Sequence, residues 1–178
     1  MAKYYGTFTY PDASEVPHFG ASASVPEALG EVVIAFEVLD EVLSTAISYL
    51  LRRTDEVGEA VTAGPTFRAK LDLLVSLFRL EAHSSRQFDR LQDLVAVCRQ
   101  ASDLRNQLVH SKWVGIWDSV DMARRKVTAR AENGLRRHVE RLTPAQVHSL
   151  ALQCSYLAWC VDELLTVEFG RDYSLDVD

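Results

Sequence analysis

The spacing of apolar residues between positions 26 and 53 constrains the fold of this chain more than any other feature. In PEALGEVVIAFEVLDEVLSTAISYLLRR, steps of mainly three and four separate Leu29, Val32, Val33, Phe36, Leu39, Leu43, Ile47 and Leu50. This period places them on one face of a long helix. Ser24 suits its N-cap, and Pro26 fits the first turn, where a missing N–H costs no hydrogen bond. The sequence therefore predicts a main strut of a helical bundle.

Two more amphipathic helices follow in the first two thirds of the chain. Residues 54–65 are polar and end in a Gly-Pro pair, which predicts a connection. Residues 66–82 then repeat apolar side chains with a helical period. A third helix is expected over about 86–112, since Ser84 or Ser85 can cap it and neither Gly nor Pro interrupts it.

The last third of the chain combines a β pattern with a final helix. Asn133-Gly134 is a hairpin turn signal between two alternating segments, so we predict a small hairpin over about 124–141. Thr143-Pro144-Ala145-Gln146 is a capping box with proline at the first helical position, and it predicts the start of the last helix. Gly170 is a suitable stop.

The expected fold class is mainly α, a four-to-five-helix up-down bundle with a small β-hairpin inserted before the last helix. We expect one domain over 24–169, an irregular arm over 1–23 and a loose acidic tail over 170–178. No apolar run approaches the roughly 20 residues of a membrane span, and the first residues lack the apolar core of a secretory signal. We therefore expect a cytoplasmic protein without a membrane partner.

The charge distribution is uneven along the chain. A net charge of −6 argues against a general field for nucleic acid. Residues 121–141, however, hold seven basic and three acidic residues, a local charge of +4 that leaves −10 elsewhere. This hairpin can follow an RNA backbone, or it can simply be a solvated edge. The RNA-binding candidates within it are Arg124, Arg125, Lys126, Arg136 and Arg137.

The cysteines and glycines do not indicate a cofactor. Cys98, Cys154 and Cys160 form no CxxC pair, and an odd number within helices favours buried free thiols. The sequence contains neither a metal-ligand spacing nor a glycine-rich phosphate loop. We therefore expect no metal and no cofactor.

The segment SDLRNQLVHSKW, residues 102–113, contains the main candidate site. On an ideal helix, Asn106, Gln107 and His110 lie within about 60° of Asp103, on the polar face. Arg105 lies about 200° from Asp103, inside the apolar arc. A guanidinium keeps its charge there, so its burial requires a carboxylate or a special site.

Two interpretations of this segment remain open at the level of the helix pattern. In one, Arg105 forms a structural bridge with Asp40 or Glu41 and His110 is merely exposed. In the other, Arg105 and His110 act together at a seam between two subunits, because about 140° separates them on one helix.

The segment LRNQLVHS resembles the motif of the HEPN superfamily, the "higher eukaryotes and prokaryotes nucleotide-binding" helical domains. That motif is an arginine, four to six residues that often begin with a polar one, and a histidine; Arg105, Asn106 and His110 match it. The resemblance covers roughly residues 26–168, and the inserted hairpin is similar to that of a prokaryotic subgroup often associated with phage defence. It implies a homodimer whose two motifs face each other and cleave RNA without a metal.

The chemistry of these side chains agrees with that implication. Cleavage through the RNA 2′-OH needs a base and an acid, and two copies of His110 can supply both. Arg105 can bind the phosphate and stabilise its developing charge, while Asn106 orients the histidine or a phosphate oxygen. Asp40, or else Glu37 or Glu41, is expected to restrain Arg105, and Asp103 is a second supporting residue.

The expected function is thus a dimeric endoribonuclease, a toxin or phage-defence effector with an antitoxin protein as a further partner. The alternative is a non-catalytic HEPN-like module that binds a nucleotide, RNA or a protein. A third interpretation is a purely structural helical dimer.

Overall fold

The computed structural model describes residues 24–80, 84–115, 121–130 and 134–169, and it is mainly helical in this part of the chain. The arm over 1–23, the tail over 170–178 and Asn133 of the expected turn lie outside the described residues. The helices are α1 (Val25–Leu50), α2 (Glu56–Ala63), α3 (Phe67–Leu80), α4 (Ser85–Val109) and α5 (Pro144–Phe169). The strands are β1 (Lys112–Gly115), β2 (Met122–Arg130) and β3 (Gly134–Leu142). The expected fold class is confirmed.

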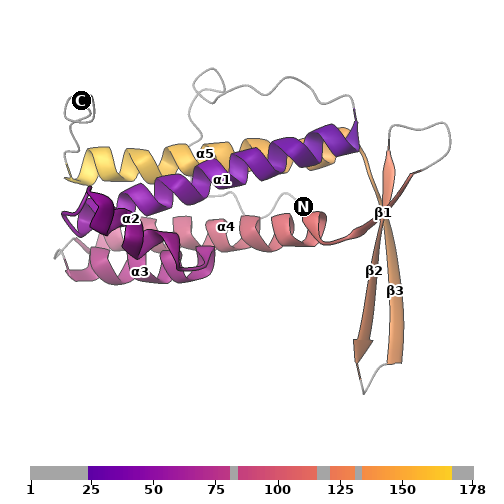
Figure 1. The fold of residues 1–178 in the computed structure, drawn as a ribbon, viewed down its shortest axis with the longest axis horizontal. Helices are drawn as coiled ribbons and strands as arrows, with labels where there is room; N and C mark the ends of the chain where they lie inside the picture. Colours follow the sequence, from indigo (N-terminus) through magenta and orange to yellow (C-terminus); the bar gives the residue numbers. More distant parts are fainter. Residues whose placement is uncertain (1–23, 81–83, 116–120, 131–133, 170–178) are drawn as a thin grey trace.

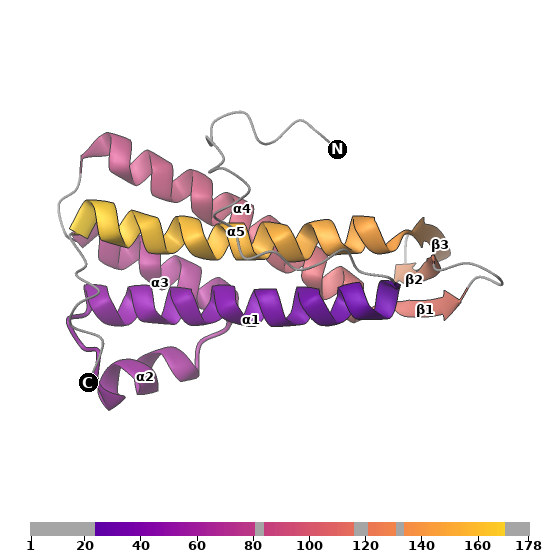
Figure 2. The same cartoon turned by 90° about the horizontal axis from the view of Figure 1, so that it is seen from above.

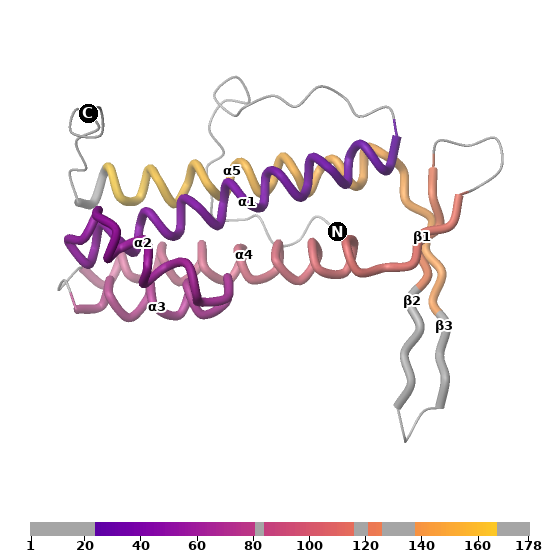
Figure 3. The backbone as a smooth tube through the Cα atoms, in the orientation of Figure 1, coloured from indigo at the N-terminus to yellow at the C-terminus, as the bar shows by residue number. Residues whose placement is uncertain are grey.

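The long helices pack in two layers, with α1 beside α5 and α3 beside α4 (Figures 1 and 2). The sheet lies at the end of the bundle where α4 ends and α5 begins (Figure 1). The backbone trace shows α4 running toward the sheet and α5 running away from it (Figure 3). The end of α4, the first strand and the start of α5 therefore meet at one end of the molecule.

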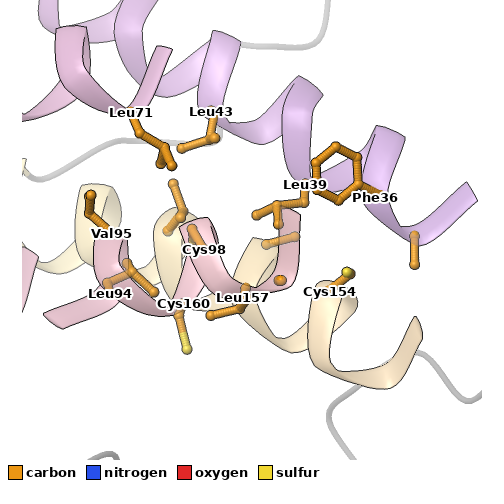
Figure 4. Packing of buried hydrophobic residues seen from close by; sticks show 14 of the residues in the cluster. Phe36, Leu39, Leu43, Leu71, Leu94, Val95, Cys98, Cys154, Leu157 and Cys160 are labelled. Carbon is orange, nitrogen blue, oxygen red and sulfur yellow. The ribbon is translucent and has the colours of Figure 1, made fainter. Parts of the chain in front are cut away.

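The apolar faces expected from the helical period form the core. Phe36, Leu39 and Leu43 of α1 meet Leu71 of α3 and the α4 and α5 side chains (Figure 4). Leu39 and Leu43 have no exposed surface, as expected for the centre of a stripe at helical spacing. Burial of this kind is the main source of the stability of such a bundle.

The predicted hairpin is part of a larger sheet. β1 pairs antiparallel with β2, and β2 pairs antiparallel with β3, so three strands replace the expected two over 124–141. Trp113 and Met122 pack against the core, and Leu142 is buried. Because alternate residues of a strand face opposite sides, the sheet has one face toward the bundle and one toward solvent.

The region after α1 differs from the prediction. α1 ends at Leu50 rather than near Arg53, because Arg52 adopts a φ of 55° and the Arg53 N–H turns back to the Ser48 carbonyl at 2.9 Å. The segment predicted as a plain connection over 54–65 contains α2, which Asp55 caps. Gly58 permits this packing, since a Cβ there would lie 1.8 Å from the Arg53 carbonyl oxygen.

Two charged or titratable side chains, Lys70 and His148, are paired between helices. Lys70 of α3 is almost fully buried, and its Nζ donates to Asp40 Oδ2 at 2.5 Å and to Ser44 Oγ at 2.8 Å. His148 of α5 contacts Glu31 Oε2 of α1 through Nδ1 at 2.7 Å, and both side chains are mostly buried. These pairs join α1 to its neighbours on either side.

Replacing Gly58 by Ala should destabilise the protein, whereas Gly30→Ala should stabilise it. A Cβ at position 58 meets backbone, which cannot move aside as a flexible side chain can, so we expect a loss of about 2 kcal/mol or more. Position 30 is an exposed site in α1 with nothing within 4 Å, and alanine should add about 0.5–1 kcal/mol. Denaturant unfolding of both variants measures the two effects. Equal stabilities would contradict this account of the α1–α2 turn.

The three cysteine thiols should not react in the folded protein. All three are buried, and burial raises the pKa of Cys154 to about 12 and that of Cys160 to about 11; the pKa of Cys98 is raised further still. Thiol reagents attack the thiolate, which is scarce under these conditions. A disulfide reagent at pH 8 should titrate less than one thiol per folded chain and three after denaturation. Rapid reaction of the folded protein would show that the core opens readily.

Candidate functional site

The end of α4 positions the candidate site. α4 stops at Val109, three residues before the predicted end, so His110 is the C-cap and not a helical residue. Neighbouring groups satisfy the last carbonyls of the helix, as helix ends require. The carbonyls of Asn106, Gln107 and Leu108 accept hydrogen bonds from the His110 N–H (3.1 Å), Ser111 Oγ and Trp113 Nε1 (2.9 Å), respectively. The chain therefore turns into β1 within two residues.

Arg105 lies in the apolar stripe of α4, as the sequence predicts. Only 21% of its side chain is exposed, and its guanidinium lies over the Phe36 ring at 5.1 Å. The Arg105 charge also opposes the increase that burial causes in the pKa of Cys154, which places this cation close to α5. A permanent positive charge thus stands where α1, α4 and α5 meet.

The hydrogen-bonding groups of Arg105 are only partly satisfied. NH2 lies 3.6 Å from Glu37 Oε1, NH1 donates to Asn106 Oδ1 at 3.2 Å, and Nε is buried with no hydrogen-bond partner. An unmet buried donor costs about 1–3 kcal/mol. Asp40, the carboxylate expected on Arg105, instead pairs with Lys70, and Glu37 takes its place. The prediction of Asp40 as the restraint was wrong because Lys70 is buried against it.

His110 lines an open depression of about 590 Å³ at the junction of α4 and the sheet. Its lining comprises Asp103, Asn106, Gln107, His110, Ser111, Lys112 and Arg125. The predicted polar face of the helix therefore does form one surface, which includes Asp103, Asn106, Gln107 and His110. The depression offers an imidazole, two amides and a hydroxyl, groups that donate to and accept from phosphate and sugar oxygens.

Two cations stand side by side at the strand end of this depression. Lys112 of β1 is the direct partner of Arg125 of β2, and both are exposed. Arg125 was predicted from the sequence as an RNA-binding candidate, whereas Lys112 was not. Lys112 follows the helix directly, and only the register of the strands places it opposite a second cation.

The other RNA-binding candidates have different surroundings. Arg124 bonds to Glu140 of β3 and is mostly buried, so it is not available at the surface. The backbone register pairs Lys126 with His138 and places Arg136 and Arg137 opposite Thr128 and Val127. The side chains of those three basic residues lie outside what the structure describes.

Arg105 and His110 do not share one surface within the chain. His110 lines the depression and Arg105 does not, but Asn106 connects them: its Oδ1 accepts from Arg105, and its side chain is part of the lining. This agrees with the wide angle expected from the helical wheel. One chain alone presents the histidine outward and holds the arginine behind the asparagine.

In the described part of the chain, His, Cys, Asp and Glu side chains do not gather in groups of three or more that can hold a metal ion. None of the described helices combines the length and apolar character of a membrane span.

Comparisons with known proteins do not place this chain in a family. No family model matches it, and neither the search of curated proteins nor that of solved structures returned a match.

Arg105 and Lys70 should respond differently to replacement by methionine. The long bridge from Arg105 to the exposed Glu37 contributes little, and the unmet Nε offsets the contact with Phe36, so Arg105→Met should change stability by less than about 1 kcal/mol. Lys70→Met removes two short hydrogen bonds and should cost about 2 kcal/mol. Thermal unfolding compares the two variants. A larger loss for Arg105→Met would favour the structural interpretation of Arg105.

Proposed function

We propose that this chain is a metal-independent endoribonuclease of the HEPN type that acts as a homodimer in the cytoplasm. The observation that carries the proposal is the connection from Arg105 through Asn106 to the depression that His110 lines. The arginine, the asparagine and the histidine are also the residues that match the HEPN motif. A toxin or phage-defence effector with an antitoxin partner is the setting that we propose for this activity.

The proposed reaction is an attack of the RNA 2′-oxygen on the neighbouring phosphorus. A base removes the 2′-OH proton, the phosphorus–oxygen bond to the 5′-oxygen breaks, and an acid protonates that leaving oxygen. The nucleophile belongs to the substrate itself, so one imidazole as base and one imidazolium as acid suffice. Arg105 stabilises the charge on the non-bridging oxygens, which its planar set of donors fits.

A dimer supplies the second imidazole. In the described part of one chain, the depression is lined by a single histidine, His110. A two-fold axis beside it brings a second copy of His110 to the same phosphate, since an isologous interface places identical residues opposite one another. The same axis brings the exposed fifth of the Arg105 side chain toward a phosphate shared by both subunits.

A non-catalytic binding module is the second candidate. The specific observation in its favour is that the described depression is open and that its cations, Lys112 and Arg125, are exposed. Such a surface can hold an anion without any proton transfer.

Replacing His110 by Ala separates these two functions. His110 is exposed, so the variant should keep its melting temperature and oligomeric state. The loss of an acid and a base should lower RNA cleavage by about a hundredfold or more. His138→Ala is the matched control, because His138 is also exposed but does not line the depression. Cleavage of labelled RNA in the presence of a metal chelator is the measurement. Undiminished cleavage by His110→Ala would show that this motif does not catalyse the reaction.

A further inference from the structure

The cross-strand pair of Lys112 and Arg125 is unfavourable for the sheet by itself. Residues directly opposite on antiparallel strands lie on the same face with their Cβ atoms close together, and like charges in such a pair are destabilising. The third strand offers no compensation, since Val139 is the partner of Arg125 on the other side and is exposed. Neither cation has an ion-pair partner among the described side chains.

The adjoining positions of the sheet show the usual compensated arrangement. Arg124, one residue earlier, lies opposite Glu140 and pairs with it on the face toward the bundle. Arg141 pairs with Asp121 at 2.8 Å. Among the sheet cations whose side chains the structure describes, Lys112 and Arg125 thus differ from Arg124 and Arg141 in having no counter-charge, and both border the depression.

The charges around the depression favour an anion of one or two negative charges. One carboxylate, Asp103, also lines it. With a neutral His110, the two cations Lys112 and Arg125 therefore leave the lining with a net positive charge. The C-terminal end of α4 adds about half a negative charge, but its last carbonyls are capped by neighbouring groups. Arg125 can hold two phosphate oxygens with its planar donors, and Lys112 acts as a point charge.

We propose that Lys112 and Arg125 form a phosphate-binding subsite that holds an RNA backbone phosphate beside His110. The identity of the polymer rests on the proposed function, whereas the phosphate chemistry rests on the cross-strand pair and the depression. The subsite positions the strand, and neither cation takes part in the proton transfers. Asn106 and Gln107 border the same depression and face the sugar or base of the bound nucleotide.

Binding of a 2′-O-methyl RNA oligonucleotide to the full chain tests this proposal without cleavage, because such RNA lacks the attacking hydroxyl. The double variant Lys112→Gln/Arg125→Gln should bind about tenfold more weakly at low salt. Loss of the contact with one backbone phosphate should also reduce the slope of log K against log salt by about 0.7. Fluorescence anisotropy at several salt concentrations measures both quantities.

Two controls separate the subsite from a general charge effect. Arg68→Gln/Arg86→Gln removes the same charge at exposed positions of α3 and α4 that do not line the depression, and it should leave the affinity within about twofold of the original. Asp103→Asn removes the carboxylate and should strengthen binding. Equal weakening by both double variants, or no change with Asp103→Asn, overturns the subsite.

Stability and competition give two more readouts. The Lys112→Gln/Arg125→Gln variant should keep or raise its melting temperature, because it relieves a repulsion, whereas a structural role would lower it. Uridine monophosphate and inorganic phosphate should compete only at concentrations far above that of the oligonucleotide. Competition at equal concentration would make this a free-phosphate or nucleotide site and overturn the RNA assignment.

The subsite and the nuclease can fail separately. Weaker binding by Lys112→Gln/Arg125→Gln together with full cleavage by His110→Ala overturns the nuclease and leaves the subsite in place. Unchanged binding by the double variant together with loss of cleavage in His110→Ala overturns the subsite alone.

Discussion

The position of Arg105 within the apolar stripe of α4 is the constraint on which the rest of the candidate site depends. Leu91 and Cys98 occupy the same stripe at intervals of seven, and both have no exposed surface. Arg105 is the next residue at this interval. It places a charge that cannot be neutralised in the contact between α1, α4 and α5. The Phe36 ring, a distant Glu37 carboxylate and Asn106 compensate that charge in part. A fixed cation with an unmet buried donor is a costly way to build a core.

The abrupt end of α4 places the depression that His110 lines next to Arg105. Because His110 caps the helix and β1 starts at Lys112, the imidazole, two amides and one strand cation gather within a few residues of chain. Only the pairing of β1 with β2 adds Arg125, from thirteen positions further on. The inserted sheet therefore contributes both of the cations that line the depression. It also connects the end of α4 to the start of α5.

Much of the bundle could be predicted from sequence, because long helices with an apolar period and capping serines carry strong local signals. The depth of Arg105 and the shared face of Asp103, Asn106 and His110 followed from the same periodicity. The features that were not predicted from the sequence depend on contacts between residues far apart in the chain. Lys70 is buried against a carboxylate thirty residues away, and α2 contains a glycine whose close approach to another turn has no local signal. The register that places Lys112 opposite Arg125 likewise arises from the pairing of β1 with β2, and neither strand specifies it alone.

The proposed composite site requires two chains that bring these depressions together, and cross-linking tests this requirement most directly. Gln107→Cys places an exposed thiol in the depression, while the three native cysteines are buried. A short bismaleimide should then yield a covalent dimer in high proportion from the Gln107→Cys protein, and little from Arg68→Cys on α3. Monomer alone from both variants would contradict a composite site around Arg105 and His110.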